Sequence, residues 1–163
     1  MHASARTAPL PTIRTLDELA ELVAGDPDGP SLYVRWSRGP GDDLAGPDTE
    51  GQTSRDALTG VELPGLSANP LGVEAWWGDR SVRLWVARRL YDYRHLRDLR
   101  GPGVCPWVLV GRQIARGPDN EPLVVCGRPV AWISDGALAE CERTVADQAS
   151  GEWGPLDRRG TTD

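Results

Sequence analysis

Three apolar, strand-like stretches follow one another late in the sequence, and their arrangement limits the possible folds more than any other feature. They are PWVLVGRQI from Pro106, PLVVC from Pro122 and PVAWIS from Pro129, and a GR dipeptide separates the last two. Two strands joined by such a dipeptide are expected to form a hairpin. Because these strands do not alternate regularly with helices, the order favours an α+β fold over a doubly wound parallel sheet.

An alternating stretch nearer the start, SLYVRWSRG from Ser31, is the clearest single strand in the chain. Successive side chains of a strand point to opposite faces, so we expect one face to meet the core and the other to form a surface. The core face is Leu32, Val34 and Trp36, and the opposite face is Tyr33, Arg35 and Ser37. A further short strand is expected around residues 65–68, ending before Asn69-Pro70.

Three segments are predicted to be helices. Thr15 and Glu18 have the spacing of a capping box in front of an apolar stripe, so the first helix begins here and ends at Gly25. The stretch SVRLWVARRLYDYRHL has apolar side chains at helical spacing, and Gly101-Pro102 lies beyond its end. The stretch GALAECERTVADQ is the third expected helix and closes the folded part of the chain.

The length of 163 residues predicts a single domain. Residues 1–11 and 150–163 are polar, contain Pro or Gly and lack any period, so disordered ends are expected around a globular domain of residues 12–149. We expect an α+β domain with about three helices and a mostly antiparallel sheet, either continuous or split. Residues 39–60 are rich in Gly, Pro and Asp and predict a long loop, which in a compact domain is often functional.

The net charge of −6 opposes binding to nucleic acid and to anionic membranes. Seven arginines between residues 80 and 100 could still form a local basic patch, although arginines at helical spacing are more often a solvated helix face. The chain shows no apolar run long enough to span a membrane and no signal-peptide core near its start. We therefore expect a cytoplasmic protein whose partner is a small molecule or another protein.

Common catalytic and metal-binding motifs are absent from the sequence, including the P-loop, G-x-G-x-x-G, H-E-x-x-H and G-x-S-x-G. His95 could serve a triad or simply complement the C-terminal end of a helix. Cys105, Cys126 and Cys141 have no metal-ligand spacing and cannot all pair, so no metal is predicted and a reducing compartment fits best. Cys105 could be a nucleophile or a small buried group.

Three polar residues stand at the edges or ends of expected strands: Arg35 in LYVRWSRG, Ser67 in GLSANPL and Glu121 in GPDNEPLV. In order and context they resemble the Arg, Ser, Glu pattern of the ADP-ribosyltransferase fold, over about residues 31–134. The pattern departs from that family in having one serine instead of Ser-x-Ser, Asp119 in place of Gln or Glu, and Pro122 directly after the glutamate. The chain as a whole also resembles an uncharacterised family of small proteins from high-GC actinobacteria.

The ADP-ribosyltransferase resemblance implies NAD as cofactor and a role for each motif residue. Cleavage of the nicotinamide–ribose bond develops positive charge on the ribose, which the carboxylate of Glu121 would stabilise. Arg35 would hold a phosphate, Ser67 would orient a ribose, and Asp119 would orient the acceptor. Tyr33, on the same strand face as Arg35, and Trp76-Trp77 would add cofactor contacts, although the two tryptophans could instead pack in the core.

Each of these residues also has a simpler interpretation. Glu121 could be a loop carboxylate that pairs with Arg116 or Arg112, and Arg35 could pair with an aspartate of the following loop. On that interpretation the chain is a non-catalytic binding or interaction protein, with the 39–60 loop and Trp76-Trp77 contacting a partner. The two hypotheses differ in whether Arg35, Ser67 and Glu121 converge on one cleft.

Overall fold

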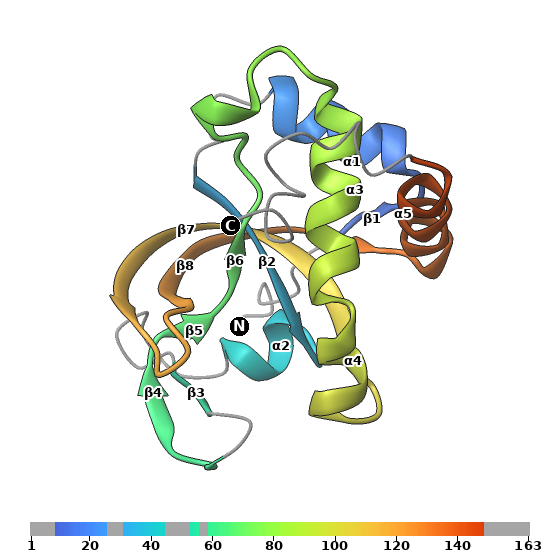
Figure 1. Ribbon diagram of the computed structural model, residues 1–163. Helices are drawn as coiled ribbons and strands as arrows, with labels where there is room; N and C mark the ends of the chain where they lie inside the picture. Colours follow the sequence, from blue (N-terminus) through green and yellow to red (C-terminus); the bar gives the residue numbers. More distant parts are fainter. Residues whose placement is uncertain (1–8, 26–30, 45–52, 56–58, 149–163) are drawn as a thin grey trace.

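The computed structural model describes residues 9–25, 31–44, 53–55 and 59–148. Their elements, in chain order, are β1 (Thr12–Ile13), α1 (Leu16–Gly25), β2 (Leu32–Ser37), α2 (Pro40–Asp43), β3 (Thr53–Arg55), β4 (Glu62–Pro64), β5 (Leu66–Ser67), β6 (Asn69–Pro70), the 3-10 helix η4 (Ala75–Trp77), α3 (Val82–Tyr93), α4 (His95–Arg100), β7 (Cys105–Arg116), β8 (Pro122–Ile133) and α5 (Asp135–Asp147). The fold is α+β, as predicted, with α1, α3 and α5 on one side of a curled sheet (Figure 1). Of the ends predicted to be disordered, only residues 9–11 are among those described.

The larger sheet is mostly antiparallel and closes on itself. Its strands follow the order β1-β8-β7-β2-β6, and β5 also pairs with β8. Only Ala68 separates β5, which pairs with β8, from β6, which pairs with β2. Residues 66–70 therefore connect the two sides of the sheet, so that β8, β7, β2 and this segment form a ring. Strands β3 and β4 make a separate two-stranded sheet.

The hairpin predicted across Gly127-Arg128 is wrong, because β8 runs through these residues without a break. The chain reverses instead at residues 117–121, where the N–H of Gly117 donates to the carbonyl of Glu121 at 2.8 Å and Asn120 takes a positive φ of 63°. Asparagine tolerates this conformation better than most residues. Three register shifts along the β7–β8 pair let the long strands bend around the ring. The segment predicted to be a turn is therefore part of one bent strand.

Strand β2 separates two hydrophobic clusters. Leu32, Val34 and Trp36 pack into the cluster beneath α1, α3 and α5, as predicted. Tyr33, on the other face, packs in a second cluster inside the ring, with Leu66, Ala68, Trp107, Leu109, Val124 and Cys126. All six residues of β2 are buried, so the face predicted to be a surface is instead covered by the closed sheet and its surroundings.

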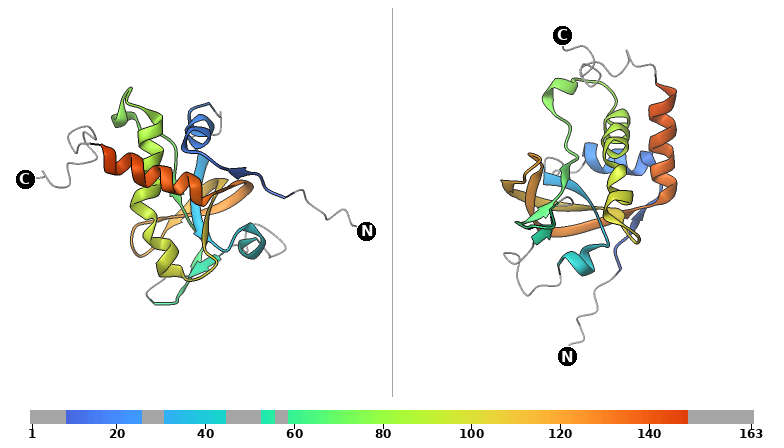
Figure 2. Two further views of the ribbon diagram at one scale, coloured as in Figure 1. Left: turned by 90° about the vertical axis from the view of Figure 1, so that its right-hand side faces the viewer. Right: turned by 60° about the horizontal axis from the view of Figure 1, so that its bottom comes forward.

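The three predicted helices are present as α1, α3 and α5, and the described residues also form the short helices α2, η4 and α4. In α1 the N–H of Glu18 donates to Thr15 Oγ1 at 3.1 Å and the N–H of Thr15 donates to Glu18 Oε1 at 3.3 Å, which confirms the capping box. The long Arg-rich helix is α3, and after Arg94 the chain continues into the short helix α4, which has no buried residue. Helices α1, α3 and α5 pack against one another in both views of Figure 2. None of the described helices is long and apolar enough to cross a bilayer.

Candidate functional site

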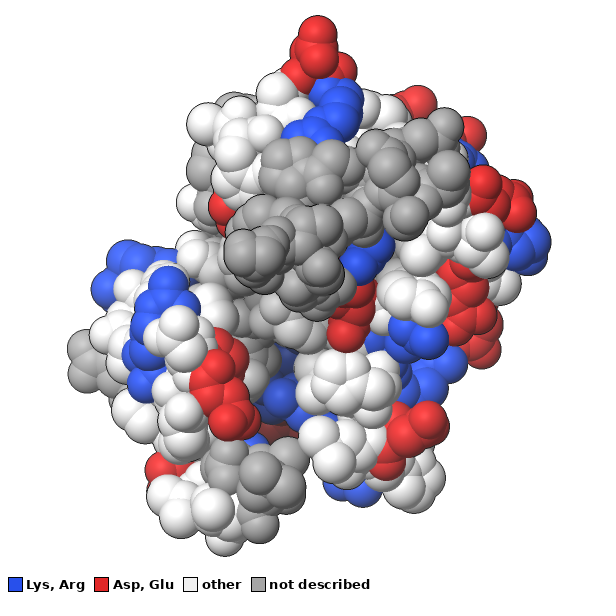
Figure 3. All heavy atoms as spheres, viewed as in Figure 1, with Lys and Arg blue, Asp and Glu red and all other residues white. Residues whose placement is uncertain are grey.

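Ser67 and Glu121 line the same cavity. This space, of about 460 Å³, lies between the start of β8, the β5–β6 segment and the helices α3 and α4, and we name it cavity A. Its walls also include Asn69, Glu74, Arg89, Tyr93, His95, Arg100, Arg116 and Asp119. In the space-filling view, arginine side chains are visible within the hollow between the strands and the helices (Figure 3).

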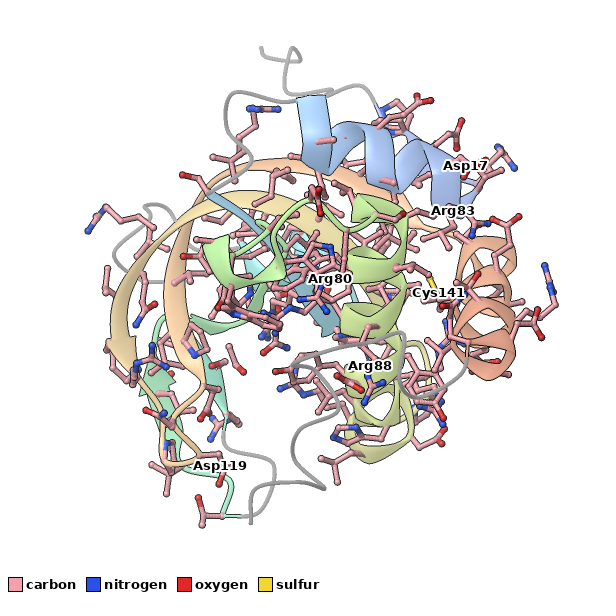
Figure 4. All side chains as sticks on the ribbon, turned by 45° about the horizontal axis from the view of Figure 1, so that its top comes forward. Asp17, Arg80, Arg83, Arg88, Asp119 and Cys141 are labelled. Atoms are coloured by element: carbon pink, nitrogen blue, oxygen red, sulfur yellow. The ribbon has the colours of Figure 1, made fainter. Side chains whose placement is uncertain are left out.

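The β7–β8 turn presents Glu121 at the edge of cavity A. Its Oε1 accepts a hydrogen bond from the N–H of Asp119 at 2.9 Å, and its carboxylate packs directly against Gly117, where a Cβ atom would collide with it. Arg116 donates to the carbonyl of Asn120 at 2.6 Å, and none of the ion pairs found in the described residues joins it to Glu121. Figure 4 labels Asp119 at this end of the hairpin. The turn thus holds the carboxylate in place through its own backbone.

Ser67 lies where two arginines meet. Its carbonyl accepts a hydrogen bond from Arg35 Nη1 at 2.8 Å, and its Oγ accepts one from Arg100 Nη2 at 3.3 Å. The N–H of Ser67 donates to Ser54 Oγ at 3.3 Å, which links β5 to the small sheet. The serine is 8% exposed and is therefore held on several sides.

Arg35 makes the aspartate pair that the simpler interpretation predicted, but inside the protein. Its Nε lies 2.6 Å from Asp43 Oδ2 and its Nη2 lies 3.3 Å from Asp43 Oδ1, with side-chain exposures of 8% and 11%. Ser37 donates to the same carboxylate and accepts a hydrogen bond from Trp107 Nε1 at 2.9 Å. Arg35 does not line cavity A, so the three residues of the predicted motif do not all converge on one cleft. Arg35 lines a second space of about 470 Å³, named cavity B.

Cavities A and B share Arg55, Leu99 and Arg100 in their walls. The pKa of Arg100 is lowered to about 10, mainly by burial and also by the positive charge of Arg35, while the negative charges of Asp43 and Glu121 act in the opposite direction. Arg100 is still charged at neutral pH, and the negative charges of both acidic residues act on it. Sequence reasoning had placed it only in an arginine-rich run, because its contact with Ser67 spans 33 residues.

The remaining residues predicted to bind cofactor do not line either cavity. Tyr33 lies inside the ring, where burial raises its pKa, and Trp77 is 1% exposed in the helix-side core. Trp76 is 41% exposed, and its Nε1 donates at 2.6 Å to Glu74, which does line cavity A. Of the predicted 39–60 loop, residues 45–52 and 56–58 lie outside the described part of the chain.

His95 and the three cysteines have different surroundings. His95 begins α4 and lines cavity A, whereas Cys105 is half-buried at the start of β7. Burial raises the pKa of Cys126 to about 11 and that of Cys141 to about 12, so both stay as thiols. Within the described ranges no group of three or more His, Cys, Asp or Glu side chains could hold a metal ion.

The walls of cavity A carry more positive than negative charge, although the whole chain has a net charge of −6. The positive side chains are Arg55, Arg89, Arg100 and Arg116, and the negative ones are Glu74, Asp119 and Glu121. Arg89 is already paired with Glu74 at 3.0 Å. The local excess of arginine favours an anionic ligand over a cationic one.

Comparison with known proteins gives a family but no reaction. A family model with the description "Family of unknown function (DUF6098)" matches residues 6–154. No curated protein matches the chain, and no solved structure does. A functional proposal therefore rests on the residues that line cavities A and B.

Proposed function

This chain belongs to the DUF6098 family of unknown function, and we propose that it binds NAD in cavity A and acts as an ADP-ribosyltransferase-like enzyme. The supporting observation is that Glu121 of the β7–β8 turn, Ser67 of β5 and Arg100 of α4 line one cavity, with Arg100 in place of the predicted Arg35. Cavity A has a volume within the range of small-molecule sites, and its excess of arginine suits the pyrophosphate of a dinucleotide.

The proposed reaction breaks the bond between the ribose C1′ and the nicotinamide nitrogen. The bonding electrons leave with nicotinamide, which becomes neutral, and the ribose carbon develops positive charge before a nucleophile attacks it. Glu121 stabilises that charge, because a fixed carboxylate near a developing cation lowers the barrier. The acceptor oxygen or nitrogen loses a proton to the solvent as the new bond forms, and Asp119, two residues from Glu121, is the residue proposed to orient this acceptor.

The hydrogen bond from the N–H of Asp119 holds Glu121 in place before the ligand arrives. Such preorganisation matters because a carboxylate that must first reorient contributes less to the transition state. Ser67, fixed by Ser54 and Arg35, is proposed to donate its hydroxyl to a ribose oxygen while its Oγ still accepts from Arg100. Arg35 supports this arrangement through the carbonyl of Ser67 and is not proposed to contact the cofactor.

The test combines binding and turnover. NAD at millimolar concentration should raise the melting temperature of the wild-type protein, because a ligand that binds only the folded state stabilises it. Glu121→Gln should retain this shift and lose nicotinamide release by on the order of 100-fold or more, as expected for loss of a charge that acts mainly in the transition state. Nicotinamide is measured by chromatography.

Glu62→Gln is the matched control, since Glu62 is an exposed carboxylate on β4 and does not line cavity A. It should release nicotinamide at the wild-type rate. If NAD gives no thermal shift, or if Glu121→Gln is as active as Glu62→Gln, the transferase proposal is refuted. The non-catalytic binding protein considered from the sequence would then replace it.

A further inference from the structure

Cavities A and B meet at the C-terminal end of α4. Arg55 and Arg100 belong to the walls of both, and Arg100 is the last residue of that helix. Each cavity alone has a volume of about 460 to 470 Å³. A ligand longer than one cavity would therefore pass beside these two guanidinium groups.

Arg35 is poorly suited to bind such a ligand. All three guanidinium nitrogens already donate hydrogen bonds: Nε and Nη2 donate to Asp43, and Nη1 donates to the carbonyl of Ser67. The side chain is 8% exposed, and the Asp43 carboxylate neutralises its charge at close range. An arginine in a bidentate pair with a buried carboxylate cannot also offer that fork to an anion.

Arg100 has the opposite properties. It uses one hydrogen bond to the carbonyl of Trp36 at 2.8 Å and one long hydrogen bond to Ser67 Oγ at 3.3 Å. A guanidinium has five N–H donors, so most of its donor capacity is uncommitted among the described residues. No acidic side chain in the described ranges lies within ion-pair distance of Arg100, whereas Arg35, Arg89 and Arg97 each have such a partner.

We infer that the junction of cavities A and B is an anion-binding site for a pyrophosphate group, with Arg100 as its main ligand-binding arginine and Arg55 as the second. This inference rests on the proposed function in taking a dinucleotide as the complete ligand, but the anion site can be tested alone. Arg55 is exposed and donates to the carbonyl of Gly60 at 2.9 Å, which leaves other N–H groups for a phosphate oxygen. The planar fork of arginine matches two phosphate oxygens at once.

The charges around the junction agree with this assignment. Asp43 is neutralised by Arg35, so it opposes an anion only weakly. Glu121 lies in the wall of cavity A alone, where the proposed reaction places the ribose that becomes positive. The site therefore has a cationic junction and an acidic end, an arrangement that would orient a ligand carrying a pyrophosphate beside a nascent cation.

The probe for the test is inorganic pyrophosphate, titrated calorimetrically in a low-chloride buffer. The wild type should bind it, and Arg100→Gln should weaken binding at least tenfold. Arg97→Gln is the matched control, because Arg97 lies on the same helix, pairs with Asp135 at 2.9 Å and lines neither cavity. It should bind pyrophosphate within about twofold of the wild type, since it removes the same charge away from the junction.

Arg100→Lys guards against a folding defect, since loss of the contact with Trp36 could destabilise Arg100→Gln. Lysine keeps the charge but not the fork, so it should bind pyrophosphate several-fold more weakly than the wild type while keeping its circular dichroism spectrum. The inference is overturned if the wild type does not bind pyrophosphate, or if folded Arg100→Gln or Arg100→Lys binds it as tightly as Arg97→Gln.

Turnover separates this inference from the proposed function. If nicotinamide is released, Arg100→Gln should raise the KM for NAD at least tenfold with a smaller effect on kcat. An unchanged KM would overturn the Arg100 assignment and leave the transferase intact. Pyrophosphate binding that depends on Arg100, without any nicotinamide release, would support the anion site and refute the transferase.

Discussion

Arg35 and Asp43 bring opposite charges together in a part of the protein that water hardly reaches. The pair is joined to Ser37, Trp107 and the carbonyl of Ser67, so it connects β2, α2, β7 and β5. Burying either charge alone is expensive, and the geometry of the pair offsets that cost only while both partners are present. We therefore propose a structural role for Arg35, to which the ADP-ribosyltransferase resemblance gave phosphate binding.

Removing one charge of this pair should be strongly destabilising. We expect Asp43→Asn to lower the free energy of unfolding by about 3 to 5 kcal/mol, because the Arg35 charge is left buried without its counter-charge. Asp17→Asn is the comparison, since Asp17 pairs with Arg83 at 2.7 Å but the two side chains are 73% and 42% exposed (Figure 4). It should cost at most about 1 kcal/mol. Urea unfolding measures both, and equal losses would contradict the structural role of the buried pair.

At the level of single elements, local sequence patterns were sufficient to predict α1, α3, α5 and β2. The Thr15 and Glu18 capping box and the apolar spacing of α3 act within a few residues, so they can be read without knowing the fold. The bend in β8 could not be distinguished from a turn, because Gly127 and Pro129 are common in both. The strand predicted around residues 65–68 is present as β5, but Asn69-Pro70 forms a further strand, β6, where the chain was expected to leave the sheet. The partners of β5 and β6 lie more than 30 residues away, a relation that no local pattern contains.

The residues of the candidate site also include some that the sequence predicts and some that depend on long-range contacts. Ser67 and Glu121 were named from the sequence, and the structure places both in cavity A. Arg100 was not named, because its importance depends on the long-range approach of β5 to the end of α4. The aromatic cofactor contacts were inferred from residue type alone, and residue type does not specify that Tyr33 faces the inside of a ring.

Gly65, directly before β5, allows the ring to close. It has a φ of +102°, and a Cβ atom there would lie 3.1 Å from the carbonyl oxygen of Val124 and 3.3 Å from Ile114 Cδ1. Alanine would therefore add crowding at the β5–β8 pair to the strain of a left-handed backbone. Gly60 also has a positive φ, of +75°, but a Cβ atom there would meet nothing within 4 Å.

These two glycines form a matched pair for mutation. Gly60→Ala should cost about 1 to 2 kcal/mol, the usual penalty of the left-handed conformation alone. Gly65→Ala should cost about 1 to 3 kcal/mol more, because overpacking adds to that penalty. Chemical denaturation of both variants gives the comparison. If Gly65→Ala is no less stable than Gly60→Ala, close contact at the ring closure is not a constraint.

In the described residues, two hydrophobic clusters share β2 as a common wall, and each contains a buried cysteine. Cys126 lies inside the ring and Cys141 lies in the helix-side core. Both thiols have a raised pKa in the folded protein and regain an ordinary pKa on unfolding, so folding retains their protons. The stability they contribute is complete below about pH 9 and is lost as the pH rises towards their folded pKa values of about 11 and about 12.

The free energy of unfolding should therefore fall between pH 8 and pH 10 by about 1.4 kcal/mol for each buried thiol. Cys141→Ala should show a fall smaller than that of the wild type by this amount, because it retains only the Cys126 thiol among the two. Urea unfolding under reducing conditions at both pH values provides the measurement. An equal fall in the wild type and the variant would show that Cys141 is not held as a neutral thiol.

The closure of the ring by residues 66–70 links the order of synthesis to the order of folding. Strands β2, β5 and β6 are made before α3, whereas β7 and β8 follow α4. A growing chain cannot complete the ring until Val124, which pairs with β5, has left the ribosome, and until β7 and β8 are made β5 and one edge of β2 lack their partners. Unpaired strand edges recruit other chains, so the nascent protein would benefit most from a chaperone during the synthesis of its second half.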